Sequence, residues 1–126
     1  MSEKLSGFRM PAEWEPQKSV WIAWPYNKND WPGLYKFIPE VILEIIYKIS
    51  KHQKVNLIIN SKIKSIKKIL ESSKIKNISL HKIKTDRIWL RDSGPIFLIN
   101  KKYKKKIILN FVFNGWAKYK NHKNDN

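Results

Sequence analysis

The stretch "PEVILEIIYKISKHQKVNLIIN", residues 39–60, carries the two clearest structural signals of the chain. Five apolar residues recur in its first part at helical spacing: Val41, Ile42, Ile45, Ile46 and Ile49. This periodicity predicts an amphipathic helix over 39–51, with Pro39 at the first helical position and Glu40 at the positive end of the helix dipole. The apolar run that follows predicts a strand over 54–60. A helix that leads directly into a buried strand is typical of an α/β fold.

The segments on either side of this stretch continue the alternation. The run "SVWIAWP", residues 19–25, predicts a strand that Pro25 ends. On the other side, Ile63, Ile66, Ile69 and Leu70 mark a second amphipathic helix. We expect Asn60 or Ser61 to cap this helix, because Asn and Ser favour the N-cap position. A further strand is expected near "NISLHKI", residues 77–83.

The last part of the chain has a different pattern. Two apolar runs, separated by a lysine-rich connection, predict a hairpin over 95–113. The whole order predicts an α/β architecture with right-handed crossovers, in which "WLRDSG", residues 89–94, lies in a loop that leads into a strand. The final "KYKNHKNDN" is polar, and we expect no closing element there.

The composition limits the chemistry that the chain can perform. Its 126 residues suit one domain, and 42% of them are hydrophobic, so a packed core is expected. The chain holds no cysteine, which excludes a disulfide, a thiolate metal site and a cysteine nucleophile from this polypeptide. His52, His81 and His122 do not have metal-ligand spacing, and we expect no metal and no cofactor. No signal peptide and no run of about 18 apolar residues is present, so we expect a cytoplasmic protein without a membrane partner.

The net charge of +16 raises the question of nucleic-acid binding. Only Arg9, Arg87 and Arg91 among the 26 basic residues are arginine, and the lysines are spread over the whole chain. This distribution favours a solvated basic surface, and we expect no specific nucleic-acid partner. The alternative is a basic nucleic-acid-binding module, which binding to duplex DNA at rising salt would distinguish.

The motif "RIWLRDSGPIF", residues 87–97, places Asp92 among bulky apolar residues. A carboxylate in such surroundings needs a partner, which is either Arg91 or a cation from outside the chain. A structural alternative is that Asp92 only caps the turn through Ser93 and Gly94. Asp86 and Arg87 are expected to fix the loop through hydrogen bonds, and we expect the same of the glutamates in "PAEWEP", Glu13 and Glu15, with a place near the pocket for one of them as the alternative. The remaining tryptophans are expected to be structural core residues: Trp14, Trp21, Trp24, Trp31 and Trp116.

Four motifs together carry a resemblance to a known family: "RMPAEWEPQKSVWIAWP", "WPG", "DRIWLRDSGPIF" and "FNGWAKY". In this order, they resemble the agmatine deiminases and the bacterial peptidyl-arginine deiminase family to which those enzymes belong. The match spans nearly the whole chain. The "GWAKY" segment differs from the "GWGGKY" form of some members, which leaves the substrate within the family open.

The resemblance implies a pentein-like β/α-propeller of αββαβ units. This chain would form only the first part of the ring, with 1–126 as the N-terminal part of an agmatine deiminase-like domain.

The resemblance also implies a reaction. The complete enzyme would convert agmatine to N-carbamoylputrescine and ammonia in putrescine biosynthesis, with a cysteine that attacks the guanidinium carbon and a histidine as acid and base. In the family these residues lie further along, beyond residue 126, so the chain supplies no catalytic residue and is expected to be inactive alone. Trp89 and Asp92 match family positions at the substrate. Asp92 would bind the planar guanidinium, and Trp89 would stack on it. Deimination of peptidyl or free arginine, a non-catalytic remnant, and a homo-oligomeric state of the complete enzyme stay open.

Overall fold

The computed structural model describes residues 5–102 and 104–126. Its first half is a three-stranded parallel sheet in the order β1-β2-β3, formed by β1 (Ser19–Ala23), β2 (Lys54–Ile59) and β3 (Ile78–Lys82). The helices α1 (Ile38–Ser50) and α2 (Ile63–Ser72) connect these strands. The predicted alternation of strands and helices is therefore confirmed, with element boundaries within a few residues of those expected from the sequence.

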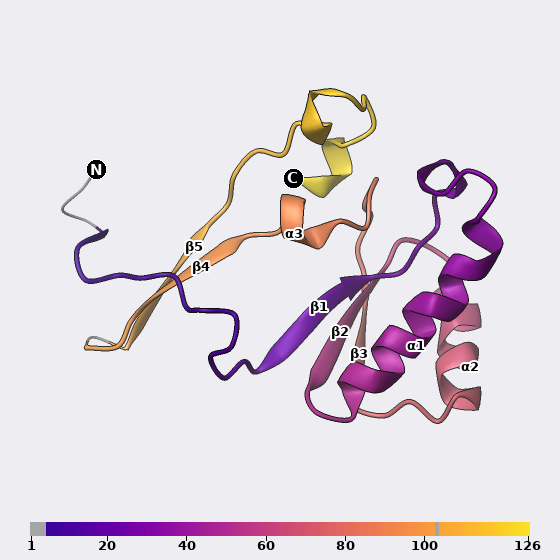
Figure 1. Cartoon of the computed structure of the whole chain (residues 1–126), viewed down its shortest axis with the longest axis horizontal. Coiled ribbons are helices and arrows are strands. Elements are labelled where there is room, and N and C mark those ends of the chain that lie inside the picture. The colour runs from indigo at the N-terminus through magenta and orange to yellow at the C-terminus, as the bar shows by residue number, and fades with distance from the viewer. Residues whose placement is uncertain (1–4, 103) are drawn as a thin grey trace.

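Both helices pack on one face of this sheet. The core joins Ile46 of α1 and Leu70 of α2 to the alternate β2 residues Val55, Leu57 and Ile59, all of which are buried. Because consecutive parallel strands lie side by side in the order β1-β2-β3, right-handed crossovers place both connecting helices on the same side (Figure 1). The central strand is thus covered and holds the sheet together.

An antiparallel hairpin follows and extends away from the helices (Figure 1). It consists of β4 (Ile96–Asn100) and β5 (Lys105–Leu109), with Phe97 opposite Ile108. A backbone bridge between Arg9 and Ile99 joins the N-terminal segment to β4. The hairpin prediction is confirmed, but the expected end at residue 113 is too late. Phe113 makes no strand pair; instead its backbone N–H donates to Asn126 Oδ1 at 2.6 Å.

The predicted cap of α2 is wrong. Lys62 occupies the N-cap position with a left-handed backbone (φ 58°) and makes no side-chain cap hydrogen bond. Asn60 lies two residues before this position, and its side-chain amide donates to the Thr85 carbonyl oxygen, at 3.1 Å. A long-range contact therefore replaces the local cap that the sequence suggested.

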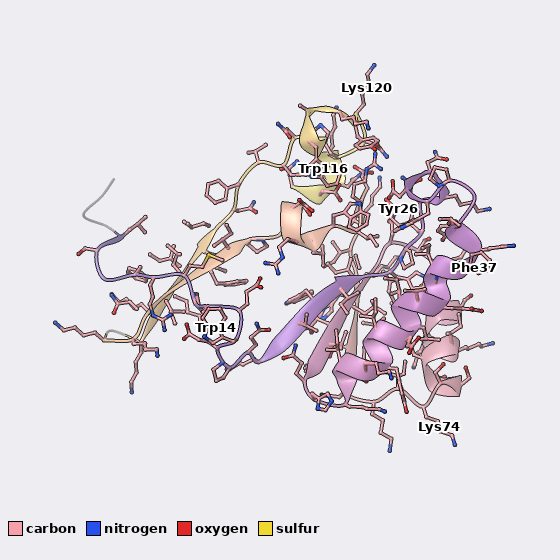
Figure 2. The ribbon with its side chains drawn as sticks, viewed as in Figure 1. Trp14, Tyr26, Phe37, Lys74, Trp116 and Lys120 are labelled. Atoms are coloured by element: carbon pink, nitrogen blue, oxygen red, sulfur yellow. The ribbon has the colours of Figure 1, made fainter. Side chains whose placement is uncertain are left out.

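The C-terminal segment is also more structured than we expected. It contains two short 3₁₀ helices, Gly115–Ala117 and Lys123–Asp125, in addition to Lys28–Asp30 and Tyr35–Phe37 earlier in the chain. The segment folds back beside the short helix α3 (Leu90–Ser93), where Figure 2 shows Trp116. The polar composition of the segment did not predict these helices, because the contacts that hold the segment are hydrogen bonds to residues about 38 positions away.

The tryptophans differ in burial, so their common assignment to the core is wrong. Trp14 is 89% exposed, and Trp21 and Trp116 are nearly half exposed, whereas Trp24 and Trp31 are partly buried. Among the helices that the structure describes, none has the length and apolar character needed to cross a bilayer.

Candidate functional site at the carboxyl edge of the parallel sheet

The "WLRD" motif forms one helical turn beyond β3. We expected a loop here, but Leu90–Ser93 is the short helix α3, and the Asp92 N–H donates to the Trp89 carbonyl oxygen at 3.0 Å. Residues three apart on such a turn lie on the same side. Trp89 and Asp92 are three residues apart on this turn, and both residues are exposed.

The partner of Asp92 is not Arg91. Arg91 instead forms an ion pair with Glu13 of the N-terminal segment. Asp92 Oδ1 accepts a hydrogen bond from Trp116 Nε1 at 3.3 Å. A neutral indole does not neutralise a carboxylate, so the negative charge of Asp92 remains available to a cation.

Trp89 belongs to an aromatic pair. Its ring lies 5.9 Å from the ring of Trp31, with an interplanar angle of 41°. Trp31 follows the 3₁₀ helix Lys28–Asp30 in the connection after β1, whereas Trp89 follows β3. The two outer strands of the parallel sheet thus contribute neighbouring aromatic rings beyond their carboxyl ends, where functional groups gather in α/β proteins.

Arg87, two residues before Trp89, connects three separate segments of the chain. Its guanidinium forms an ion pair with Asp30, donates to Asn121 Oδ1 and lies 4.1 Å from the centre of the Tyr119 ring. The side chains of Arg87 and Asp30 are 6% and 2% exposed, so this pair is shielded from solvent. Burial raises the pKa of Asp30, and the attraction of Arg87 only partly opposes that rise. The expectation that Arg87 fixes the loop is confirmed.

Two further carboxylates connect the C-terminal segment to this loop. Asp125 Oδ1 accepts from the N–H groups of Asp86 and Arg87, at 2.8 and 3.1 Å, while Asp86 accepts from the backbone and side chain of Asn124 at 2.9 and 2.8 Å. Burial raises the pKa of Asp125 despite the two hydrogen bonds that it accepts. Burial would also raise the pKa of Asp86, but the hydrogen bonds from Asn124 and the charges of Lys84 and Arg87 together outweigh it, and the pKa is lowered. The expected hydrogen-bonding role of Asp86 is confirmed.

The glutamates of the N-terminal segment also serve as structural partners. Arg9 donates to both carboxylate oxygens of Glu15, and the Ala12 N–H donates to Glu15 Oε1 at 2.8 Å. These contacts lower the pKa of Glu15 to about 2, with the hydrogen bond from Arg9 as the largest cause. Together with the Glu13–Arg91 pair, they confirm the expectation that both glutamates hold local structure.

Sequence reasoning missed Asp30, Trp116, Asn121 and Asp125. One signal that could have indicated Asp30, Asn121 and Asp125 is the density of Asn and Asp in "NKND" and in "NHKNDN", since these residues accept backbone hydrogen bonds at turns. No cluster of three or more His, Asp or Glu side chains within 5–102 and 104–126 could hold a metal ion. His81, for example, contacts Asn56 Oδ1 at 3.0 Å on the sheet and lies apart from the other histidines in the sequence.

Residues 9–126 match the family described as Porphyromonas-type peptidyl-arginine deiminase. A protein of Yersinia pseudotuberculosis that bears the name "Putative agmatine deiminase" is 32% identical over 116 residues, which cover 90% of this chain and 30% of that protein. The fold is similar to that of agmatine deiminase of C. jejuni, solved as a cysteine-to-serine variant with substrate bound. The TM-score is 0.76, with 28% identity over 94% of this chain and 34% of that one. An agmatine deiminase structure from Enterococcus faecalis has a TM-score of 0.62 and 30% identity, over 77% and 26% of the two chains. The chain thus spans about a third of the length of these relatives.

Proposed function

Because the chain belongs to the Porphyromonas-type peptidyl-arginine deiminase family, we propose that it forms the guanidinium-binding side of an agmatine deiminase site, with Asp92 and Trp89 as the substrate-binding residues. The observation that supports this proposal most is the exposed carboxylate of Asp92, which has no cationic partner among the described residues although Arg91 adjoins it. Unlike the partly buried Asp86 and Asp125, which accept hydrogen bonds from backbone N–H groups, Asp92 is exposed, and its place in the motif beside Trp89 suits a flat cation.

The chemistry of a guanidinium agrees with this pair of side chains. The group is planar and presents its N–H donors in a fixed fork, which a carboxylate accepts in the plane while an aromatic ring covers the face. Asp92 would contribute the in-plane acceptor and Trp89 the face contact. Trp31, whose ring lies beside that of Trp89, would limit its movement.

The complete reaction requires groups outside these 126 residues. Deimination of agmatine consumes one water and yields N-carbamoylputrescine and ammonia, through attack of a thiolate on the guanidinium carbon in the family mechanism. The chain has no cysteine, so we propose that it contributes binding and that the propeller ring and the nucleophile belong to the remainder of a family-length protein. The site's role in putrescine biosynthesis is part of the same proposal.

The binding role can be tested with this chain and agmatine by calorimetric titration. Asp92→Asn keeps the shape but removes the charge, and we expect it to weaken agmatine binding about tenfold or more, as for the loss of a hydrogen bond between charged groups. Putrescine, which lacks the guanidinium, should bind much more weakly than agmatine to the unaltered chain. The matched control is Glu44→Gln on α1, which removes an exposed carboxylate that pairs with Lys48.

Two results would count against the proposal. Agmatine could bind equally to the unaltered chain and to Asp92→Asn, or agmatine and putrescine could bind alike. Either result would mean that the cation recognised by this chain is not a guanidinium held by Asp92. Titration with free arginine in parallel separates an agmatine site from the arginine alternative within the family.

A further inference from the structure

Asp92 is exposed, and an exposed carboxylate ordinarily rotates among several rotamers. Here the indole N–H of Trp116 donates to Asp92 Oδ1 at 3.3 Å, from a segment 24 residues further along the chain. Within the described residues, Trp116 is the one hydrogen-bond donor to this carboxylate, and Oδ2 accepts none. The contact therefore holds one oxygen and leaves the other to a ligand.

The backbone that carries Trp116 has an unfavourable conformation. Trp116 has φ 56° and ψ 29°, and Ala117 has φ 55°, which is the left-handed region that residues with a Cβ avoid. Such outliers persist only when surrounding contacts determine them, and they concentrate at functional sites. This conformation directs the indole of Trp116 toward α3.

Packing fixes the Trp116 ring in that position. The ring meets Phe113 edge to face at 4.8 Å, and Phe113 is buried. On another side the ring lies 5.9 Å from Tyr119, which in turn lies against the guanidinium of Arg87. The indole N–H is thus held by a packed segment, shown with Trp116 beside α3 in Figure 2.

From these contacts we infer that Trp116 is a positioning residue for guanidinium recognition: its indole N–H orients the Asp92 carboxylate so that Oδ2 faces the incoming cation. The inference rests on the proposed function of Asp92. Trp116 does not touch the ligand in this role; it reduces the conformational freedom that Asp92 would otherwise lose on binding. Because the donor is neutral, it orients the carboxylate without competing for its charge.

The test is a double-mutant cycle in this chain, with agmatine as the probe. Trp116→Phe keeps an aromatic ring but cannot donate a hydrogen bond, and we expect agmatine affinity to fall about three- to tenfold, as for the loss of one hydrogen bond. In the Asp92→Asn background the same change should have no further effect, because the group that Trp116 positions is already altered. Trp21→Phe is the matched control, since Trp21 and Trp116 are 45% and 41% exposed and Trp21 lies on β1 beside His81.

A spectroscopic measurement without ligand makes the inference independent of how well Trp116→Phe folds. The ¹H–¹⁵N signal of the Trp116 indole should move in Asp92→Asn, while that of Trp21 should stay. An unmoved Trp116 signal would overturn the inference, and so would unchanged affinity in Trp116→Phe or additive effects of the two substitutions. If Asp92→Asn weakens binding and Trp116→Phe does not, the proposed function stands and only the positioning role fails. If the unaltered chain does not bind agmatine, both fail together.

Discussion

The buried ion pair between Arg87 and Asp30 allows a quantitative prediction about stability. Arg87→Met keeps the apolar stem and removes the guanidinium, which leaves the Asp30 carboxylate 2% exposed and without a counter-charge. Removal of one partner from a buried pair costs about 3–5 kcal/mol. The lost contact with the Tyr119 ring adds to this, by about 0.5–2 kcal/mol for a cation over an aromatic face.

The destabilisation by Arg87→Met should depend on pH, because it depends on the charge of Asp30. Burial already raises the pKa of Asp30 above its ordinary value of 3.8, and loss of Arg87 should raise that pKa further. A carboxyl group with a raised folded-state pKa destabilises the fold above that pKa, and the cost disappears as the pH falls toward the unfolded value. The destabilisation by Arg87→Met should therefore be full at pH 7.5 and clearly smaller at pH 4.5.

Urea unfolding at 25 °C at both pH values measures the effect. The double variant Asp30→Asn/Arg87→Met should recover part of the loss, because the unpaired charge of Asp30 is removed. Arg9→Met is the control, since Arg9 also pairs with a carboxylate but its side chain is 45% exposed. The free energy of unfolding should fall much less in Arg9→Met than in Arg87→Met. The reasoning is refuted if Arg87→Met lies within about 1 kcal/mol of the unaltered chain at pH 7.5, or if its effect does not change with pH.

Two further predictions concern stability. Ala117→Gly should stabilise the fold by about 1 kcal/mol in thermal unfolding, because Ala117 has φ 55° and glycine adopts this conformation without strain; Ala23→Gly on the buried strand β1 should destabilise it. A loss of stability in Ala117→Gly would contradict the left-handed assignment. Glu15→Gln should lower the melting temperature at pH 7, and this difference should vanish as the pH falls from about 4.5 toward 2, since the pKa of Glu15 is lowered to about 2 by Arg9 and the Ala12 N–H. A difference that persists at pH 2 would exclude the ionised Glu15 as its source.

The amino-acid sequence by itself determined the helices and strands of the first half. Ile42, Ile46 and Ile49 mark one helix face with no information from elsewhere, and the run from Val55 to Ile59 can only be a buried strand or a buried helix, of which its length favours the strand. Helical and strand periodicities are local, so a window of ten to fifteen residues contains the whole signal. The turn at "WLRD" was not determined in this way, because the sequence pattern indicated a loop where the structure has the short helix α3.

The tertiary structure alone decided which partners the charged residues have. Arg91 adjoins Asp92 in sequence, yet it pairs with Glu13, and Asp92 contacts Trp116 instead. Arg87 pairs with Asp30 at a separation of 57 residues, and Asn60 donates a hydrogen bond to Thr85, 25 residues away, while Lys62 occupies the helix N-cap position. Each of these pairings depends on where the sheet brings the ends of its strands. A carboxylate or guanidinium is compatible with many partners, and only the folded chain selects among them.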